Sequence, residues 1–180
     1  PALSRRAQFR MVKVTEAKMA HPAPDDLSER DFYAWTQDHA ARLRALGKDN
    51  RFDVAHVAEE IEDLWAHQRS AVASDLRQAL QHLLLLAGSP AEEPRHKWLD
   101  EVDLHCDEVR SLLAQSPSLS RKTDVNDVWR NAVRAASRKL ARDGEGTLRA
   151  DATCPLTMTD STDDDRDWRT LKRLWPRGHR

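Results

Sequence analysis

The longest uninterrupted hydrophobic pattern in the chain runs from Asp53 to Ala87 and predicts one long central helix. This stretch contains neither Gly nor Pro, and Asp53 is a good N-cap residue. Phe52 and Val57 have the spacing of the two partners of a hydrophobic staple around that cap. With about 100° between successive helical residues, the apolar side chains share one stripe. They are Val54, Val57, Ile61, Leu64, Trp65, Val72, Leu76, Ala79, Leu83 and Leu86.

An N-terminal helix is predicted between Ser28 and Gly47. Ser28 is a suitable N-cap, and Asp31 follows three residues later, which is a helix-start pattern. Gly47 is a typical residue at a helix end. The apolar side of this helix, spaced by three and four residues, is expected to consist of Phe32, Trp35, His39, Leu43 and Leu46.

Two more helices are predicted after the central one. The Gly- and Pro-containing stretch 88–94 turns the chain, and residues 116–120 separate the two helices. The first should bury Trp98, Val102, Cys106, Val109, Leu112 and Leu113. The second, which starts at Thr123 or Asp124, should bury Val125, Val128, Trp129, Ala132, Ala136 and Leu140. Because the connections are short, we expect neighbouring helices to be antiparallel, which predicts an all-α bundle of four main helices.

The two ends of the chain carry weaker patterns than the predicted bundle domain, residues 27–142. Residues 1–26 are expected to be a leader or disordered segment, because no apolar stretch follows their arginine pair and a Pro-containing linker closes them. Residues 143–180 are expected to form a loop and a short C-terminal helix, packing on the bundle or extending from it. There, Trp168 and Trp175 would pack back on the bundle or offer an apolar surface to a partner subunit.

The composition excludes several classes of protein. The chain of 180 residues has a net charge of -1, so it has no overall attraction to nucleic acid or to an anionic membrane. Its apolar runs are far shorter than the roughly 20 residues that cross a bilayer. Cys106 and Cys154 are too far apart in sequence for a zinc-ligand pair, and they form no disulfide framework. We therefore expect a cytoplasmic protein without a membrane partner.

Five short motifs, taken in order, are similar to a known bacterial family. They are DFYAWT at 31–36, EEIEDL at 59–64, HLL at 82–84, Trp98 at the start of a helix, and SPSL at 116–119. Over roughly residues 31–140 the chain resembles the family called Domain of Unknown Function 29. The resemblance implies a small bacterial all-helical protein and brings no activity, substrate or cofactor. Trp65 and Leu85 stand where the family pattern suggests Gly and Lys, so a function shared through those residues would be missing here.

Polar side chains inside the apolar stripes are the first set of candidate site residues. Asp75 and His82 lie in the stripe of the central helix, His105 lies in that of the next helix, and Gln68 and His39 are further cases. Buried polar groups need hydrogen-bond partners. If the two helices fold back around position 91, Asp75 comes close to His105. The prediction is a bonded pair that fixes helix register, and the alternative is a His/Asp metal or acid–base site.

Two charged faces form the second set of candidates. Glu59, Glu60 and Asp63 lie opposite the stripe, which disfavours a metal site in the bundle core and favours a solvated face or a docking face. The segment 53–65 has five acidic residues and no basic one. The fourth main predicted helix, which starts at Thr123 or Asp124, repeats arginine every four residues, at Arg130, Arg134 and Arg138. That face is expected to be solvated, paired within the chain, or docked against an acidic protein or a second copy; nucleic acid is least favoured, because no recognition motif accompanies the arginines.

Taken together, these patterns favour a helical protein that binds other macromolecules over an enzyme. We expect no cofactor and no metal, and either an unidentified protein partner or self-association. The chain has no Gly-rich phosphate loop and no triad spacing of Ser, Cys and His. The alternative is a metal-dependent or acid–base enzyme that uses Asp75, His82 and His105.

Overall fold

The computed structural model describes residues 27–47, 52–146, 148 and 153–160, and within these ranges the secondary structure is entirely helical. The elements in order are α1 (Leu27–Arg30), α2 (Phe32–Ala45), α3 (Val54–Gly88), α4 (Arg95–Gln115), the short 3-10 helix η1 (Pro117–Arg121) and α5 (Val125–Arg142). None of the helices in this part of the chain combines the length and apolar character needed to cross a membrane. The predicted all-α class is confirmed, while the predicted helix near the C-terminus lies outside the described residues.

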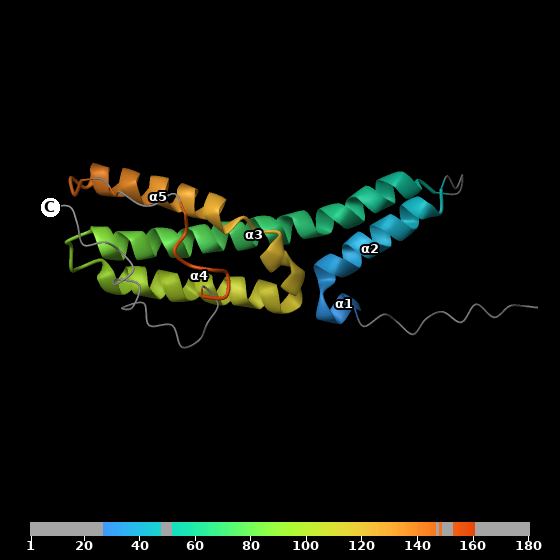
Figure 1. Ribbon diagram of the computed structural model, residues 1–180, viewed down its shortest axis with the longest axis horizontal. Helices are drawn as coiled ribbons and strands as arrows, with labels where there is room; N and C mark the ends of the chain where they lie inside the picture. Colours follow the sequence, from blue (N-terminus) through green and yellow to red (C-terminus); the bar gives the residue numbers. More distant parts are fainter. Residues whose placement is uncertain (1–26, 48–51, 147, 149–152, 161–180) are drawn as a thin grey trace, which may run out of the picture.

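The long helix α3 is the axis of the molecule (Figure 1). Helices α4 and α5 pack along its C-terminal half, and α2 packs along its N-terminal half, away from the other two. Consecutive main helices run antiparallel, as the short connections predict. We call residues 32–47 and 52–69 the arm, and residues 70–142 the bundle. The four predicted main helices are therefore all present, but they do not share one cross-section.

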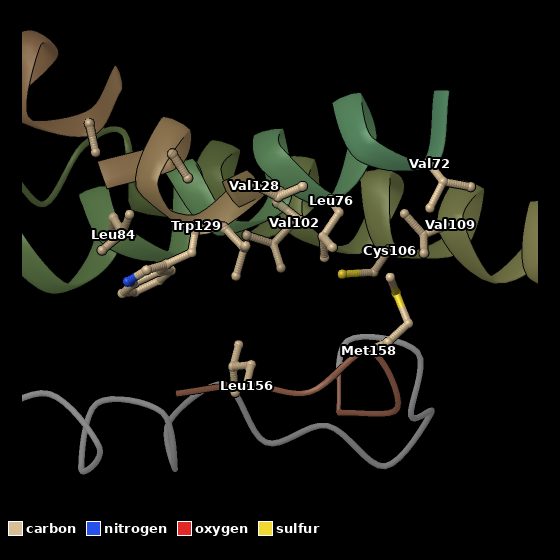
Figure 2. Close-up of a cluster of buried hydrophobic side chains, with 14 of the residues drawn as sticks. Val72, Leu76, Leu84, Val102, Cys106, Val109, Val128, Trp129, Leu156 and Met158 are labelled. Atoms are coloured by element: carbon tan, nitrogen blue, oxygen red, sulfur yellow. The ribbon is translucent and has the colours of Figure 1, made fainter. Parts of the chain in front are cut away.

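The hydrophobic core lies in the bundle, where α3, α4 and α5 meet (Figure 2). Helix α4 buries Trp98, Val102, Cys106 and Val109, as predicted, while Leu112 and Leu113 of the predicted face are only partly buried. Helix α5 starts at its N-cap Asp124, as predicted, and buries Val128, Trp129, Ala132, Ala136 and Leu140. Helices α4 and α5 cover this half of α3, where Val72, Leu76, Ala79 and Leu86 of the predicted stripe are buried and Leu83 is partly buried. Three leucines outside the predicted stripe are at most 1% exposed, namely Leu80, Leu84 and Leu85.

The segment formed by residues 153–160, which follows α5, adds to this core from a third side. Leu156 and Met158 are buried, and Figure 2 shows their side chains pointing from this segment toward the bundle, with Met158 directed at Cys106. The backbone amide of Cys154 donates to the Asn126 side chain at 2.9 Å, which holds the segment against the start of α5. Residues 153–160 of the predicted loop thus pack on the bundle.

Two predictions for the N-terminal helix are wrong. Helix α2 is capped by Asp31 and not by Ser28, because the Asp31 carboxylate accepts from the backbone amide of Ala34 at 3.0 Å; Ser28 lies in the preceding four-residue helix α1. The buried side of α2 consists of Tyr33, Thr36 and Ala40, while the residues predicted for that side are partly or largely exposed. Small side chains and a Thr36 hydroxyl that bonds the carbonyl of Tyr33 allow this face to pack closely.

The N-terminal half of α3 also departs from the predicted stripe. Asp53 is its N-cap, as predicted, and accepts from the backbone amide of His56 at 3.1 Å. However, Val57 and Leu64 are 38% and 53% exposed, because only α2 covers this half of the helix. Phe52 is also exposed, so the predicted staple with Val57 buries little of either side chain.

Candidate functional site

Asp75, His82 and His105 come together at the interface between α3 and α4. The Nδ1 atom of His105 donates to the Asp75 carboxylate at 3.0 Å. The rings of His82 and His105 stack with centroids 6.3 Å apart and planes 12° from parallel. Seven residues, about two helical turns, separate Asp75 from His82 along α3, and His105 reaches both of them from α4. The structure thus places the three polar residues predicted within the stripes in one cluster.

Glu101 joins this cluster and was not among the predicted site residues. Its carboxylate lies 3.7 Å from Nε2 of His105, so the two ring nitrogens of His105 face two different carboxylates. One potential ligand atom from each of His82, Glu101 and His105 lies within 4.8 Å of the other two. The available sequence signal was the i, i+4 spacing of Glu101 and His105, which puts both on one face of α4.

The cluster is partly shielded from solvent. The side chains of His105 and Asp75 are 12% and 21% exposed. The Nδ1 atom of His82 is buried and has no hydrogen-bond partner among the described residues. Burial lowers the pKa of His82 below its ordinary value, and the positive charges near it, Lys97 and Lys139, act in the same direction against the opposing effect of Glu101. Burial thus favours the neutral form of the His82 ring.

An open pocket of about 580 Å³ lies next to the cluster, between α3, the start of α4 and the end of α5. His82 and Glu101 contribute to its wall, so the cluster is reached from solvent through this pocket. The charged side chains around it are Lys97, Lys139, Glu101, Asp143 and Glu145. Lys139 already donates to Asp143 at 2.9 Å. Three carboxylates against two ammonium groups give the pocket an excess of negative charge.

The predicted charged faces lie on different halves of the molecule. Glu59, Glu60 and Asp63 are exposed on the arm, whereas Arg130, Arg134 and Arg138 are exposed on α5, which lies along the other half of α3 (Figure 1). The two faces therefore do not pair with each other within one chain. Residues of each face have local ion pairs, such as Arg130 with Asp127 at 3.1 Å on α5 and His56 with Glu60 at 3.6 Å on the arm.

Two polar residues of the predicted stripes lie away from the cluster. The ring of His39 packs against that of Trp35 with centroids 4.4 Å apart and planes tilted by 35°, and its Nδ1 donates to the Trp35 carbonyl at 3.1 Å, so His39 belongs to the arm. Gln68 accepts from the hydroxyl of Ser116 at 3.4 Å, where the arm meets the bundle. Both therefore have local structural partners.

The motifs DFYAWT and SPSL meet in space at the joint between arm and bundle. The Asp31 carboxylate that caps α2 also accepts from the backbone amide and the hydroxyl of Ser118, at 2.8 and 2.9 Å. The backbone amide of Tyr33 donates to the Ser116 hydroxyl at 3.2 Å. The Tyr33 ring packs edge-on against Trp65 at 4.7 Å. The role of these motifs visible in the structure is thus to join two parts of the fold.

A small all-helical protein, with a two-helix arm joined to a helical bundle, is the class that this fold defines. The family model described as "Domain of unknown function DUF29" matches residues 27–167, and the chain belongs to this family. Both residues that depart from the expected motif pattern have packing roles. Trp65 packs against Tyr33 at the joint, and Leu85 is fully buried in the core.

A solved structure supports the same fold. The chain is similar to an alpha-helical protein of unknown function from Rhodospirillum rubrum, with a TM-score of 0.72 and 26% sequence identity. The similarity covers 82% of this chain and 97% of that one. A comparison with curated proteins produced no match. The relatives therefore establish the fold and the family, and the chemistry must be argued from the residues of this chain.

Proposed function

We propose that this protein acts by binding another protein through its arm, and that the partner presents apolar side chains flanked by Lys and Arg. The observation that carries this proposal is the distribution of exposed apolar surface. Within the described residues, four of the six large apolar side chains that are exposed belong to the arm. They are Leu46 at 71%, Phe52 at 46%, Val57 at 38% and Leu64 at 53%. Concentrated apolar exposure of this kind is typical of interaction surfaces.

The chemistry of the partner follows from what surrounds these apolar residues. Val57 and Leu64 are seven residues apart and lie on the same face of α3. Glu59, Glu60 and Asp63 are exposed in the same two turns, and the segment 53–65 has no basic residue. Glu60 lies within one turn of both Val57 and Leu64, and the other carboxylates make the rest of this helix surface acidic. An exposed apolar stripe on so acidic a helix complements an amphipathic segment with basic flanks, and the charges would speed its encounter.

A second copy of this chain is a poorer match for the arm than a different protein. The basic face of α5 offers charge through Arg130, Arg134 and Arg138, but the apolar side of α5 is turned into the core. Arm-to-arm pairing would bring apolar stripes together, but it would also bring Glu60 of both copies close to one another and place two acidic helices side by side. Like charges across an interface are unfavourable. A different protein with a basic amphipathic segment supplies both the apolar surface and the positive charge that the arm requires.

The test uses a photo-crosslinking amino acid at Leu64 in the full chain, expressed in its native host. The same group at Leu104, which is 54% exposed on α4, is the matched control. We expect a partner that cross-links at Leu64 and not at Leu104, and that carries a basic amphipathic segment. With that partner purified, Leu64→Ser should weaken binding by about tenfold or more, and raised salt should weaken it further, whereas Leu104→Ser should leave it unchanged.

Two outcomes would count against the proposal. If both positions give the same cross-links, the arm is not a specific surface. The Leu64 probe could instead capture only a second copy of this chain. If the Leu64→Ser variant then no longer forms a dimer, the arm serves self-association and the proposed partner chemistry is wrong.

A further inference from the structure

We propose that His82, Glu101 and His105 bind a divalent transition-metal ion, zinc being the best match, and that Asp75 positions His105 for this role. The inference is independent of the proposed docking function, because the cluster lies in the bundle and the docking surface lies on the arm. It goes beyond the expectation of a simple hydrogen-bonded pair between Asp75 and His105.

The donor atoms indicate the class of metal. Two imidazole nitrogens and one carboxylate oxygen are a ligand set typical of zinc sites that keep a coordination position open. Magnesium and calcium prefer all-oxygen ligands and would gain little from two histidines. The set therefore favours zinc or a neighbouring first-row ion.

The spacing of the donors is compatible with such an ion. Zinc bonds to nitrogen and oxygen are about 2.0–2.2 Å long, so tetrahedral ligand atoms lie roughly 3.3–3.5 Å apart. The donors of the three residues already lie within 4.8 Å of one another, and His105 Nε2 is 3.7 Å from the Glu101 carboxylate. Small side-chain rotations close the remaining difference, and the 33% exposure of Glu101 leaves its side chain room to move.

Asp75 has the position of an orienting residue. Its carboxylate accepts from Nδ1 of His105 at 3.0 Å, which places the proton on Nδ1 and leaves Nε2 free to bind a cation on the side of Glu101. Histidine ligands of metals usually have such a second hydrogen bond, which fixes the tautomer and the ring orientation. Both helices that supply these residues pack on the core, so the backbone holds the donors in register.

A cation also accounts for features that a register-fixing pair leaves unexplained. The Asp75–His105 hydrogen bond satisfies one nitrogen of His105, but it explains neither the stacked His82 ring nor the proximity of Glu101. The buried Nδ1 of His82 lacks a partner among the described residues. Two carboxylates beside two histidines, next to a pocket with excess negative charge, attract a positive ion.

The proposed site would have an open coordination position. Three protein ligands leave the fourth position of a tetrahedral ion available to water or to a small ligand. His82 and Glu101 also form part of the wall of the pocket of about 580 Å³, so a ligand could reach the ion from solvent. This arrangement differs from a closed structural zinc site, in which four protein ligands surround the metal.

The test is metal binding by the untagged full chain after treatment with EDTA. We expect titration with zinc chloride in a calorimeter to give one ion per chain, and cobalt chloride to give the strong visible absorption of four-coordinate Co²⁺. Glu101→Gln and His82→Gln should each weaken zinc binding by at least about 100-fold. Asp75→Asn should retain one ion per chain but weaken it by about 10- to 100-fold, as expected for a positioning residue.

His96→Gln is the matched control, because His96 is an exposed histidine on the same helix as His105 and lies outside the cluster. It should leave both the affinity and the cobalt spectrum unchanged. Glu101 is partly exposed, so Glu101→Gln is expected to fold, and equal helix content by circular dichroism would verify this. The proposal is overturned if the parent chain shows no saturable binding, or if His96→Gln and Glu101→Gln reduce it equally.

Discussion

The two halves of α3 have similar apolar patterns and very different environments. In the bundle, Val72 and Leu76 are at most 1% exposed, because α4 and α5 cover this part of the helix. In the arm, Val57 and Leu64 are 38% and 53% exposed, because α2 alone packs there and uses another face of α3. The comparison shows that an apolar stripe predicts which side of a helix can be buried, while the number of neighbouring helices decides how much of it is.

The two halves also differ in the polar groups that accompany the apolar ones. The arm exposes its carboxylates, and Glu62 forms a bidentate ion pair with Arg44 across α2 and α3. The bundle encloses polar groups at the α3–α4 interface, where Asp75 and His105 are mostly shielded. Exposed charges suit long-range attraction of a partner, and shielded donors suit a defined ligand. The proposed docking surface and the proposed metal site follow from this difference.

The largest difference between the halves should be in stability. Leu76→Ala removes a fully buried side chain from the core, so we expect the free energy of unfolding to fall by about 2–5 kcal/mol. Leu64→Ala is the matched change on the same helix and should alter it by less than about 0.5–1 kcal/mol, because the side chain is half exposed. Urea denaturation followed by circular dichroism measures both. Equal losses would show that the arm is covered in solution.

The joint between the halves should have an intermediate effect. Asp31→Ala removes the cap of α2 and both hydrogen bonds to Ser118, so we expect a loss of about 2–3 kcal/mol. Asp53→Ala removes only the cap of α3 and should cost about 1 kcal/mol. Denaturant titrations compare the two variants. A larger loss for Asp53→Ala would mean that the contact with Ser118 does not hold the arm.

The smallest expected effect is the pH dependence that His82 contributes to the bundle. Burial lowers its pKa in the folded chain, so the unfolded chain binds the proton more readily. The contribution of His82 to stability is therefore fully present above its ordinary pKa of about 6.5 and is lost as the pH falls below that value toward the lowered pKa. Glu101, His105, Lys97 and Lys139 are the charged groups that act on it.

Urea denaturation in EDTA between about pH 7.5 and 5 measures this contribution. His82→Gln should flatten the decrease in stability toward acid pH, whereas His96→Gln, at an exposed position on α4, should keep the slope of the parent chain. If His82→Gln leaves the slope unchanged, the ring is solvated and the burial of His82 is not maintained in solution.

Much of the candidate cluster was accessible from the sequence. The polar residues inside apolar stripes identified Asp75, His82 and His105, and the length of the turn between two helices indicated which of them would meet. Glu101 was missed because it lies beside the apolar stripe of α4 and not within it. Only its position one helical turn before His105 indicates that it belongs to the cluster. The pocket is lined by residues of α3, α4 and the end of α5, including Lys97 and Lys139. Its shape depends on how these helices are placed relative to one another, which a local sequence pattern does not predict.

The sequence alone determined the helices of the bundle and most of their buried faces, because periodicity, capping aspartates and turn residues are local properties. It did not identify Leu80, Leu84 and Leu85 as buried, since they lie outside the predicted stripe of α3. Only the tertiary structure decided that α2 buries Tyr33, Thr36 and Ala40 and that Val57 and Leu64 remain exposed. The physical reason is that burial depends on which neighbour covers a face. Asp31 illustrates this, because its bonds to Ser118 join residues far apart in the chain and set the position of the arm.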